Sequence, residues 1–160
     1  MIIKIIAVGK LREKHWQDGV AEYARRLRPL AKLEMIEISE ARIPESASPA
    51  EEAMALAREG EGICEKLSRH NGPVIALDRQ GKALNSPELA AWLQGRILEG
   101  NGEMAWLIGG PLGLAPAVLD KADLVLSFSR MTFPHQMMRL ILLEQIYRSF
   151  RIMRHEPYHR

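Results

Sequence analysis

The chain has 160 residues, of which 47% are hydrophobic, and a formal net charge of +2 at pH 7. This length supports one well-buried core and is short for two ordinary domains, so we expect a single domain over residues 1–160. The one cysteine, Cys64, excludes an intrachain disulfide and fits a reducing cytoplasm. Lys4 interrupts the first apolar run, and no apolar stretch approaches the roughly 20 residues of a membrane span, so neither a signal peptide nor a transmembrane helix is expected.

The charges are unevenly distributed along the chain. Residues 1–32 carry eight Lys and Arg against three Asp and Glu, residues 33–127 carry eight against fifteen, and residues 128–160 carry six against two. If the two basic ends meet in space or across a subunit interface, they form a positive surface suited to a polyanion such as nucleic acid. Scattered, solvated charges explain the same counts equally well.

Short apolar runs alternate with longer helical patterns, which is typical of an α/β fold with a mostly parallel sheet. Ser48 and Ser86 each precede a proline and then glutamate, the pattern of a capped helix start. In chain order we expect a strand at 2–8, a helix at 15–27, a strand at 33–38, a mobile loop at 40–48, a helix at 49–68, a strand at 74–77, a helix from 86 to between 95 and 98, and strands at 104–108 and 124–128.

A last helix is expected to begin near Pro134 and to carry apolar residues around nearly its whole circumference between 137 and 150. Such a helix is buried in its own subunit on one side and in a second copy on the other, which predicts a homodimer. Two explanations of Arg148 remain open. It has a role in function, or it forms an internal pair with Glu144 one turn earlier.

Three segments lie just beyond predicted strands, at 78–82, 109–113 and 127–133. Ligands bind outside the carboxyl ends of the strands in open α/β sheets, so these segments are candidates for one shared pocket. Gly109 and Gly110 permit either close approach of a ligand or a tight turn. The segment matches neither the phosphate-binding loop nor the dinucleotide-binding glycine pattern, which disfavours a nicotinamide enzyme or a Rossmann-type methyltransferase.

The C-terminal residues 155–160 contain two histidines, a tyrosine and an arginine. They are a candidate acid–base and anion-contact cluster, although frayed termini are the common case. His135, His155 and His159 offer imidazoles for a metal, but no convincing carboxylate partner accompanies them, so we expect no metal.

Several motifs together resemble one known family along the whole chain. They are Leu77-Asp78 with Gly81-Lys82, residues 107–111 with Gly113-Leu114, residues 132–135 with Arg139, Glu144 and Tyr147-Arg148, and the terminal Pro157-Tyr158-His159. The sequence resembles the ribosomal RNA large subunit methyltransferase H family of the SPOUT class. The resemblance implies a small single-domain α/β homodimer with a mostly parallel sheet and a C-terminal trefoil knot. It also implies methyl transfer from S-adenosylmethionine to N3 of a pseudouridine in 23S rRNA of assembled ribosomes.

The resemblance assigns roles to particular positions. The expected cofactor contacts are Leu77, Gly109, Phe128, Ser129, Arg130, Met131, Thr132 and Phe133. The expected catalytic, target-side residues are His135, Arg148, Tyr158 and His159. His135 or His159 would accept the imide proton, and Arg148 or Arg154 would stabilise negative charge on the base.

Two other functions compete with this one. A non-catalytic rRNA-binding or ribosome-assembly protein would use the basic ends and keep the glycines only as a turn. A small hydrolase would use His135 with a loop serine, but the sequence lacks a nucleophile-elbow pattern.

Overall fold

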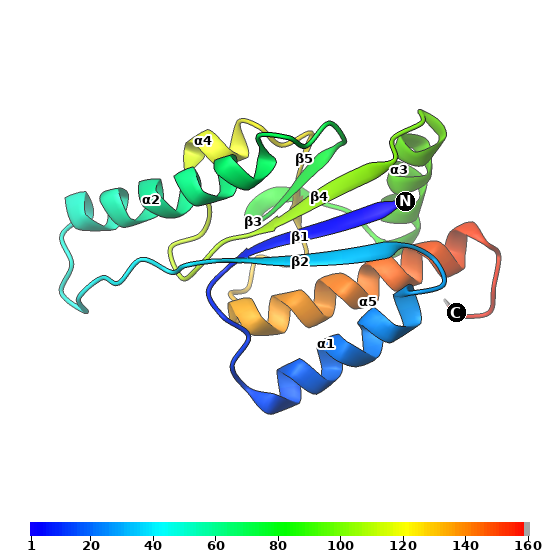
Figure 1. The fold of residues 1–160 in the computed structure, drawn as a ribbon, viewed down its shortest axis with the longest axis horizontal. Coiled ribbons are helices and arrows are strands. Elements are labelled where there is room, and N and C mark those ends of the chain that lie inside the picture. Colours follow the sequence, from blue (N-terminus) through cyan, green and yellow to red (C-terminus); the bar gives the residue numbers. More distant parts are fainter. Residues whose placement is uncertain (159–160) are drawn as a thin grey trace.

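The computed structural model describes residues 1–158, which form a five-stranded, wholly parallel sheet with helices on both faces (Figure 1). The strands in sheet order are β2 (Lys32–Ile38), β1 (Ile2–Val8), β4 (Glu103–Ile108), β3 (Val74–Ala83) and β5 (Leu124–Ser127). The helices are α1 (Lys14–Leu27), α2 (Pro49–Leu67), α3 (Ser86–Leu98), α4 (Pro116–Leu119) and α5 (His135–Met153). The predicted α/β class and parallel sheet are confirmed.

Alternating side chains of the central strands build two separate cores. Ile3 and Ile5 of β1 face a core shared with α1, α3 and α5, whereas Ile6 and Val8 face a core shared with α2 and the segment around α4. This follows from the two-residue period of a strand, which sends neighbouring side chains to opposite faces. Both faces are covered, so the strands read as continuous apolar runs, and Trp106 in β4 has no exposed surface.

Capping boxes fix the starts of two helices. Ser48 accepts a hydrogen bond from the Glu51 amide and donates its own amide to the Glu51 carboxylate, as the sequence predicts for the start of α2. The prediction for α3 is wrong by one residue. Asn85 is the cap, paired in the same way with Glu88, and Ser86 is already helical.

The third strand is longer than the predicted 74–77, because β3 continues through a register shift and pairs again with β5 at Lys82 and Ala83. The polar residues Asp78, Arg79 and Gln80 hide this continuation from a search for apolar runs. Gly81 makes it possible, since a Cβ at this position would lie 2.7 Å from backbone atoms of Val125. The four-residue helix α4 is also absent from the prediction, and it is too short to show a period.

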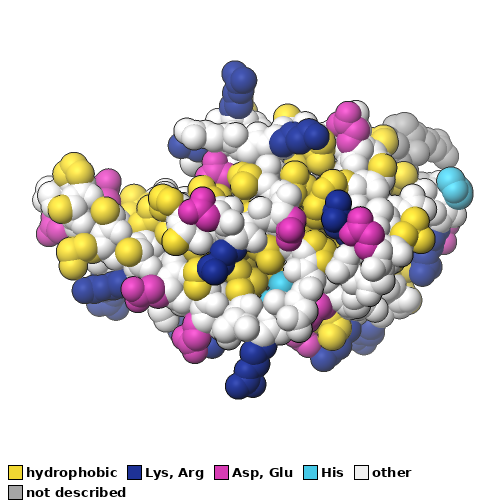
Figure 2. Space-filling view, turned by 90° about the horizontal axis from the view of Figure 1, so that it is seen from above, with side chains coloured by type: hydrophobic (Ala, Val, Ile, Leu, Met, Phe, Trp, Pro, Cys, Tyr) yellow, Lys and Arg dark blue, Asp and Glu magenta, His cyan; other side chains and the backbone are white. Residues whose placement is uncertain are grey.

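Figure 2 shows the molecule from the side of α2 and α4, where basic and acidic side chains alternate over a partly hydrophobic surface. Neither basic nor acidic side chains form a dominant patch on this face, so it is not the positive surface that the charge distribution of the sequence suggests. None of the helices within residues 1–158 has the length and apolar character needed to cross a membrane. The trefoil knot that the resemblance implies stays a prediction.

Candidate active site

A cavity of about 830 Å³ lies at the carboxyl ends of β4 and β5 and beside the middle of β3. All three segments singled out in the sequence contribute to its wall, although the segment 78–82 belongs to β3 itself and does not follow that strand. Seven of the positions expected to contact a cofactor line it: Leu77, Gly109, Phe128, Ser129, Met131, Thr132 and Phe133. The eighth, Arg130, is exposed and is not one of the lining residues. Cofactor binding at these positions stays a prediction.

The glycine segment after β4 closes on itself and presents backbone to the cavity. The Gly113 amide donates to the Gly110 carbonyl at 3.0 Å, and Gly113 has a φ of +85°. A Cβ on Gly109 would lie 2.2 Å from the Gly113 carbonyl oxygen. Only glycine fits at position 109, because the Gly113 backbone fills the space that a side chain would need, so Gly109 serves the tight turn. Gly113 has no atom within 4 Å of the place of a Cβ, which leaves open space beside it.

Hydrogen bonds join the other two segments to each other. Ser127 donates its hydroxyl to the Arg79 carbonyl at 3.1 Å, and Arg79 donates through Nη1 to Thr132 Oγ1 at 3.0 Å. Within the 127–133 segment, the Met131 amide donates to Ser129 Oγ at 3.0 Å. The loop that carries most of the predicted cofactor contacts is therefore held against the end of β3.

The lining suits a ligand with one flat apolar part and several polar groups. Its apolar members come from all sides and include Leu77, Ile108, Leu112, Phe133 and Met138, and its polar members include Asp78, Gln80 and His135. Asp78 is already oriented, because its Oδ1 accepts a hydrogen bond from the Gln80 amide at 2.8 Å. Pockets of this size and mixture are typical of cofactor sites.

His135 is the first residue of α5 and lines the cavity. Its Nε2 lies only 2.9 Å from where a Cβ on Gly9 would stand, and Gly9 has a φ of +87°. One turn later, Arg139 has no exposed surface and donates to the carbonyls of Val8 and Gly9 and to the Glu37 carboxylate. The end of β1 thus lies against the first turns of α5. In the sequence, Arg139 belongs to the motifs that carry the resemblance, but nothing there indicates its buried partners at Val8 and Gly9.

Arg148 and Tyr158 lie in a different cluster, at the far end of α5. Arg148 donates to Glu144 through Nε at 3.0 Å and Nη2 at 2.5 Å, so the internal pair that competed with a functional role is present. The Tyr158 hydroxyl lies 3.2 Å from Glu144 and 3.3 Å from the Tyr23 hydroxyl, and the guanidinium of Arg148 lies 4.9 Å from the Tyr158 ring centre. His159 is outside the described residues.

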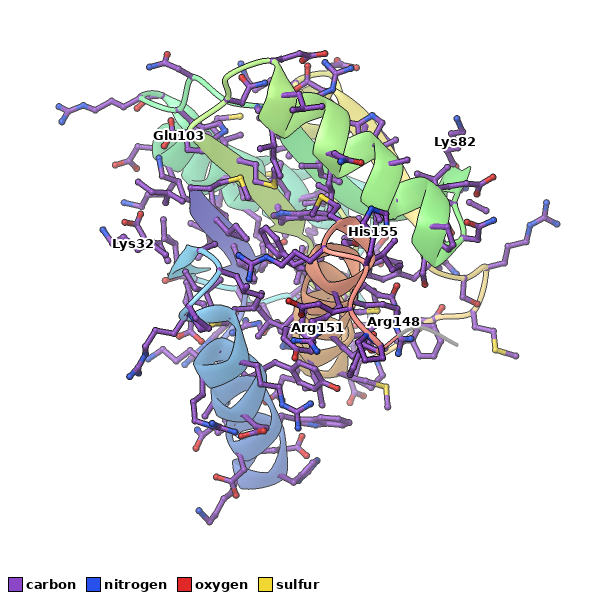
Figure 3. All side chains as sticks on the ribbon, turned by 90° about the vertical axis from the view of Figure 1, so that its right-hand side faces the viewer. Lys32, Lys82, Glu103, Arg148, Arg151 and His155 are labelled. Atoms are coloured by element: carbon purple, nitrogen blue, oxygen red, sulfur yellow. The ribbon has the colours of Figure 1, made fainter. Side chains whose placement is uncertain are left out.

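Figure 3 views this end of the molecule and shows Arg148, Arg151 and His155 gathered where α5 gives way to the C-terminal tail. Burial, followed by the hydrogen bond with Tyr23, raises the pKa of Tyr158 well above its usual value. Tyr158 therefore remains a neutral hydroxyl at physiological pH.

The two clusters are separated by the length of α5, which runs from the cavity to the end where the tail lies (Figure 1). His135 and Arg148 are thirteen residues apart, which corresponds to about 20 Å along a helix. Within one subunit, the structure does not bring His135 together with Arg148 and Tyr158.

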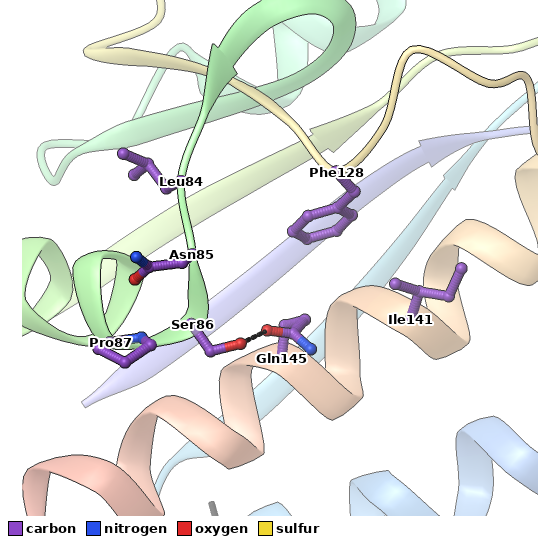
Figure 4. A pocket seen from close by; sticks show the side chains of 7 residues that line it. All are labelled: Leu84, Asn85, Ser86, Pro87, Phe128, Ile141 and Gln145. Atoms are coloured by element: carbon purple, nitrogen blue, oxygen red, sulfur yellow. Dashed lines mark hydrogen bonds between the residues drawn. The ribbon is translucent and has the colours of Figure 1, made fainter.

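A second cavity, of about 590 Å³, opens beside the middle of α5 (Figure 4). Phe128 and Ile141 form its apolar wall, and Ser86 donates to Gln145 Oε1 at 2.9 Å across its floor. Ile141 and Met137 are half-buried on this face, in contrast to Leu142 and Leu143, which have no exposed surface. Within residues 1–158, no three His, Cys, Asp or Glu side chains are grouped closely enough to hold a metal ion.

A parallel sheet with a glycine loop and a neighbouring serine-rich loop around one cavity is an arrangement of a cofactor-binding α/β enzyme. Residues 1–159 match the family described as "Predicted SPOUT methyltransferase". The chain is 50% identical to ribosomal RNA large subunit methyltransferase H of Carboxydothermus hydrogenoformans, and 52% identical to the protein of the same name from Alkaliphilus oremlandii. Each alignment spans 160 residues and covers 100% of both sequences.

Among solved structures, the fold is similar to that of a probable methyltransferase from Bordetella pertussis Tohama I, with a TM-score of 0.55. The alignment covers 92% of this chain and 95% of that one, at 14% identity, and supports the fold alone. The chain belongs to the SPOUT methyltransferase family, within the group of ribosomal RNA large subunit methyltransferase H. The resemblance noted from the motifs is confirmed.

Proposed function

We propose that this protein transfers a methyl group from S-adenosylmethionine to N3 of a pseudouridine in 23S rRNA of the large ribosomal subunit. The observation that carries the proposal is one cavity bounded by the glycine loop, the 127–133 loop and His135. Relatives at about half identity over the full length are named for this class of activity, which favours catalysis over a non-catalytic assembly role. We propose further that residues 1–160 act as one methyltransferase domain in the cytoplasm, where ribosomes are.

The cavity fits this cofactor in shape and chemistry. The glycine loop lines the cavity, and no atom lies within 4 Å of the place where a Cβ on Gly113 would stand, so a ring could approach the backbone there, with Leu77 and Phe133 as apolar walls. Main-chain groups of the 128–133 loop, Arg130 included, would bind the polar edge of that ring, and Asp78 is positioned for hydroxyl or ammonium groups. When bound, the cofactor supplies an electrophilic methyl group.

The protein must also position the pseudouridine and accept the proton that leaves its N3 atom. The imide nitrogen of pseudouridine loses its proton on methylation, and an imidazole is a suitable acceptor near neutral pH. We assign this role to His135, because it lines the cavity and its imidazole packs close to Gly9, whose carbonyl accepts a hydrogen bond from Arg139. Holding the two reactants side by side contributes most of the acceleration, since the sulfonium is already an activated donor.

We infer that the active site is shared between two subunits. The cavity and the Arg148–Tyr158 cluster lie at opposite ends of α5, so a second copy is needed to bring the target-side residues to the cavity. The half-buried face of α5 with Met137 and Ile141, beside the second cavity, is the proposed contact between copies. In that assembly, Tyr158 and His159 of one subunit would meet the base bound over His135 of the other.

The proposed function is tested by incubating the purified protein with ribosomes and methyl-labelled S-adenosylmethionine, followed by nuclease digestion and mass spectrometry of the 23S rRNA. The expected product is N3-methylpseudouridine. His135→Ala is expected to slow turnover while cofactor binding, measured by calorimetry, is retained. Absence of saturable cofactor binding by the wild type would favour the non-catalytic assembly protein instead.

The shared site is tested by complementation between two inactive variants. His135→Ala removes the proposed base, and deletion of residues 157–160 removes the proposed tail, so each homodimer is expected to be strongly impaired. Mixed dimers contain one cavity with an intact His135 and an intact tail from the other subunit, so one of their two sites is complete, and they are expected to recover up to half of the wild-type activity per dimer. Mixed dimers as inactive as both parents would show that each site is built within one subunit.

A further inference from the structure

Helix α1 contacts the C-terminal tail through Tyr23, and none of the proposed target-side residues lies in this helix. We propose that Tyr23, in α1, is a positioning residue for the methylation target, because its hydroxyl fixes the orientation of Tyr158. This inference rests on the proposed function, in which Tyr158 faces the RNA. Tyr23 lies in α1, and the sequence pattern of this helix indicates one buried face but no role in function.

The tail first turns back on α5. His155 has a φ of +54°, a left-handed conformation that is costly for a residue other than glycine. The reversal is fastened by the Glu156 amide, which donates to the Arg151 carbonyl at 3.0 Å, and by an ion pair between the two side chains. It returns Tyr158 to the level of Glu144, fourteen residues earlier in the chain. A hydrogen bond and an ion pair thus stabilise a strained turn, and together they fix the position of the tail relative to α5.

Different partners then hold the ring and the hydroxyl of Tyr158. Its ring meets the edge of Tyr147 at 5.0 Å between centres, and Tyr147 in turn meets Tyr23 at 6.2 Å. Its hydroxyl donates to Glu144 at 3.2 Å. Since that hydroxyl has one proton, the Tyr23 hydroxyl is the donor in the 3.3 Å contact between the two oxygens. Tyr147 therefore packs against the ring, whereas Tyr23 and Glu144 orient the hydroxyl.

Tyr23 adds a constraint that Glu144 cannot supply. Glu144 lies on α5, the helix from which the tail itself continues, whereas Tyr23 lies on a different helix packed beside it. Their two hydrogen bonds together fix the tail relative to both helices. Neither is needed for the α1 core contact, which the aromatic ring of Tyr23 makes by packing against the core cluster.

Three arginines, each ion-paired with a glutamate, lie over the aromatic rings of this cluster. The guanidinium of Arg26 lies 5.2 Å from the Tyr23 ring centre, that of Arg151 lies 5.8 Å from Tyr147, and that of Arg148 lies 4.9 Å from Tyr158. Arginines stacked on aromatic rings suit both phosphate groups and unstacked bases of RNA. A misplaced Tyr158 would therefore weaken target binding more than it would alter the cofactor cavity at the other end of α5.

The test compares Tyr23→Phe with Tyr147→Phe, two changes that each remove one hydroxyl and keep the ring. Tyr23→Phe is expected to raise the KM for ribosomes about 3- to 10-fold, the loss expected for one hydrogen bond, with little change in kcat or in the Kd for S-adenosylmethionine. Tyr147→Phe is expected to retain the wild-type KM. A wild-type KM for Tyr23→Phe, an equal loss in both variants, or a gain in activity would overturn the proposal.

A second readout does not depend on activity. The chain has three tyrosines, so protein labelled with ¹³C at the ring carbon bearing the hydroxyl gives three signals, assigned by the single Tyr→Phe variants. Tyr23→Phe is expected to shift the Tyr158 signal without RNA, and an unshifted signal would contradict the contact. If wild-type protein showed no methylation of ribosomes while the signal shifted, the proposed function would fail and the contact between the tyrosines would stand.

Discussion

Arg139 donates a hydrogen bond through Nη2 to the carbonyl oxygen of Gly9 at 2.6 Å, although 130 residues separate the two in sequence. The contact ties the carboxyl end of β1 to the first turns of α5. It also places Gly9 against the imidazole of His135. A buried cation thus links the sheet to the proposed base, and its loss should affect both folding and catalysis.

Arg139→Met is expected to lower the free energy of unfolding by about 3 kcal/mol, because it leaves buried carbonyls unpaired and removes the partner of Glu37. Urea denaturation measures the change. Arg25→Met serves as the control, since Arg25 is exposed and, among residues 1–158, forms an ion pair only with Glu22 on the same helix. An Arg139→Met protein as stable as wild type would contradict the structural role.

Gly9→Ala is expected to reduce methylation by displacing His135, because the new Cβ would meet Nε2 at 2.9 Å. Gly100→Ala is its matched control, with a φ of +86° against +87° for Gly9 and no neighbouring atom within 4 Å. Both variants should lose about 1 kcal/mol of stability from backbone strain. Only Gly9→Ala should lose turnover, and equal turnover in the two variants would argue against His135 as the base.

Gly109→Ala is expected to abolish saturable binding of S-adenosylmethionine, measured by calorimetry, because a Cβ at this position would force Gly113 aside and open the loop. Gly95→Ala, in α3 with no atom within 4 Å of the added carbon, should bind the cofactor as wild type does. Normal binding by Gly109→Ala would remove the glycine loop from the cofactor site.

Glu103→Gln should destabilise the protein at neutral pH. The Lys4 ammonium, at 2.5 Å, and the Asn71 amide lower the pKa of Glu103 in the folded state. A depressed pKa gives stability above the unfolded value of about 4.3, and this stability is lost as pH falls through the folded pKa. The melting temperature of Glu103→Gln should be below that of wild type at pH 7, and the gap should narrow in acid. A constant gap would contradict the assignment.

Glu59→Gln should have the opposite effect. Burial raises the pKa of Glu59, while the Ala41 amide donates to Oε1 at 2.9 Å and Oε2 lacks a hydrogen-bond partner among the described residues. A raised pKa gives stability below the unfolded value, and this stability is lost as pH rises through the folded pKa. Glu59→Gln should therefore melt above wild type at pH 7, with the difference vanishing near pH 4. A lower melting temperature at pH 7 would show that the charge is stabilising.

The sequence predicts all five strands of the sheet. β1 and β4 are easily found because strands buried on both faces are runs of apolar residues. The sequence does not predict the order of the strands, since pairing between β1 and β4 or β3 and β5 joins segments far apart in the chain. The extension of β3 past Leu77 is missed for a related reason. The extension pairs with β5 at Lys82 and Ala83, and this partner lies more than 40 residues away in the sequence, so no local pattern indicates it.

Much of the candidate cavity is predicted, because segments that follow neighbouring parallel strands must end at one edge of the sheet. Arg139 and Tyr23 are not. Their roles depend on the carbonyl of Gly9 and the hydroxyl of Tyr158, which the fold brings to them from more than 100 residues away. A periodic pattern identifies which side of a helix is buried, but it does not identify the hydrogen-bond partner that a distant segment places against that side.

The most direct test of the account is mass spectrometry of 23S rRNA from cells that lack this protein, and from the same cells carrying the wild-type or the His135→Ala gene. We expect N3-methylpseudouridine to be absent without the protein, restored by the wild type and reduced with His135→Ala. An unchanged level of N3-methylpseudouridine in cells without the protein would contradict the central claim.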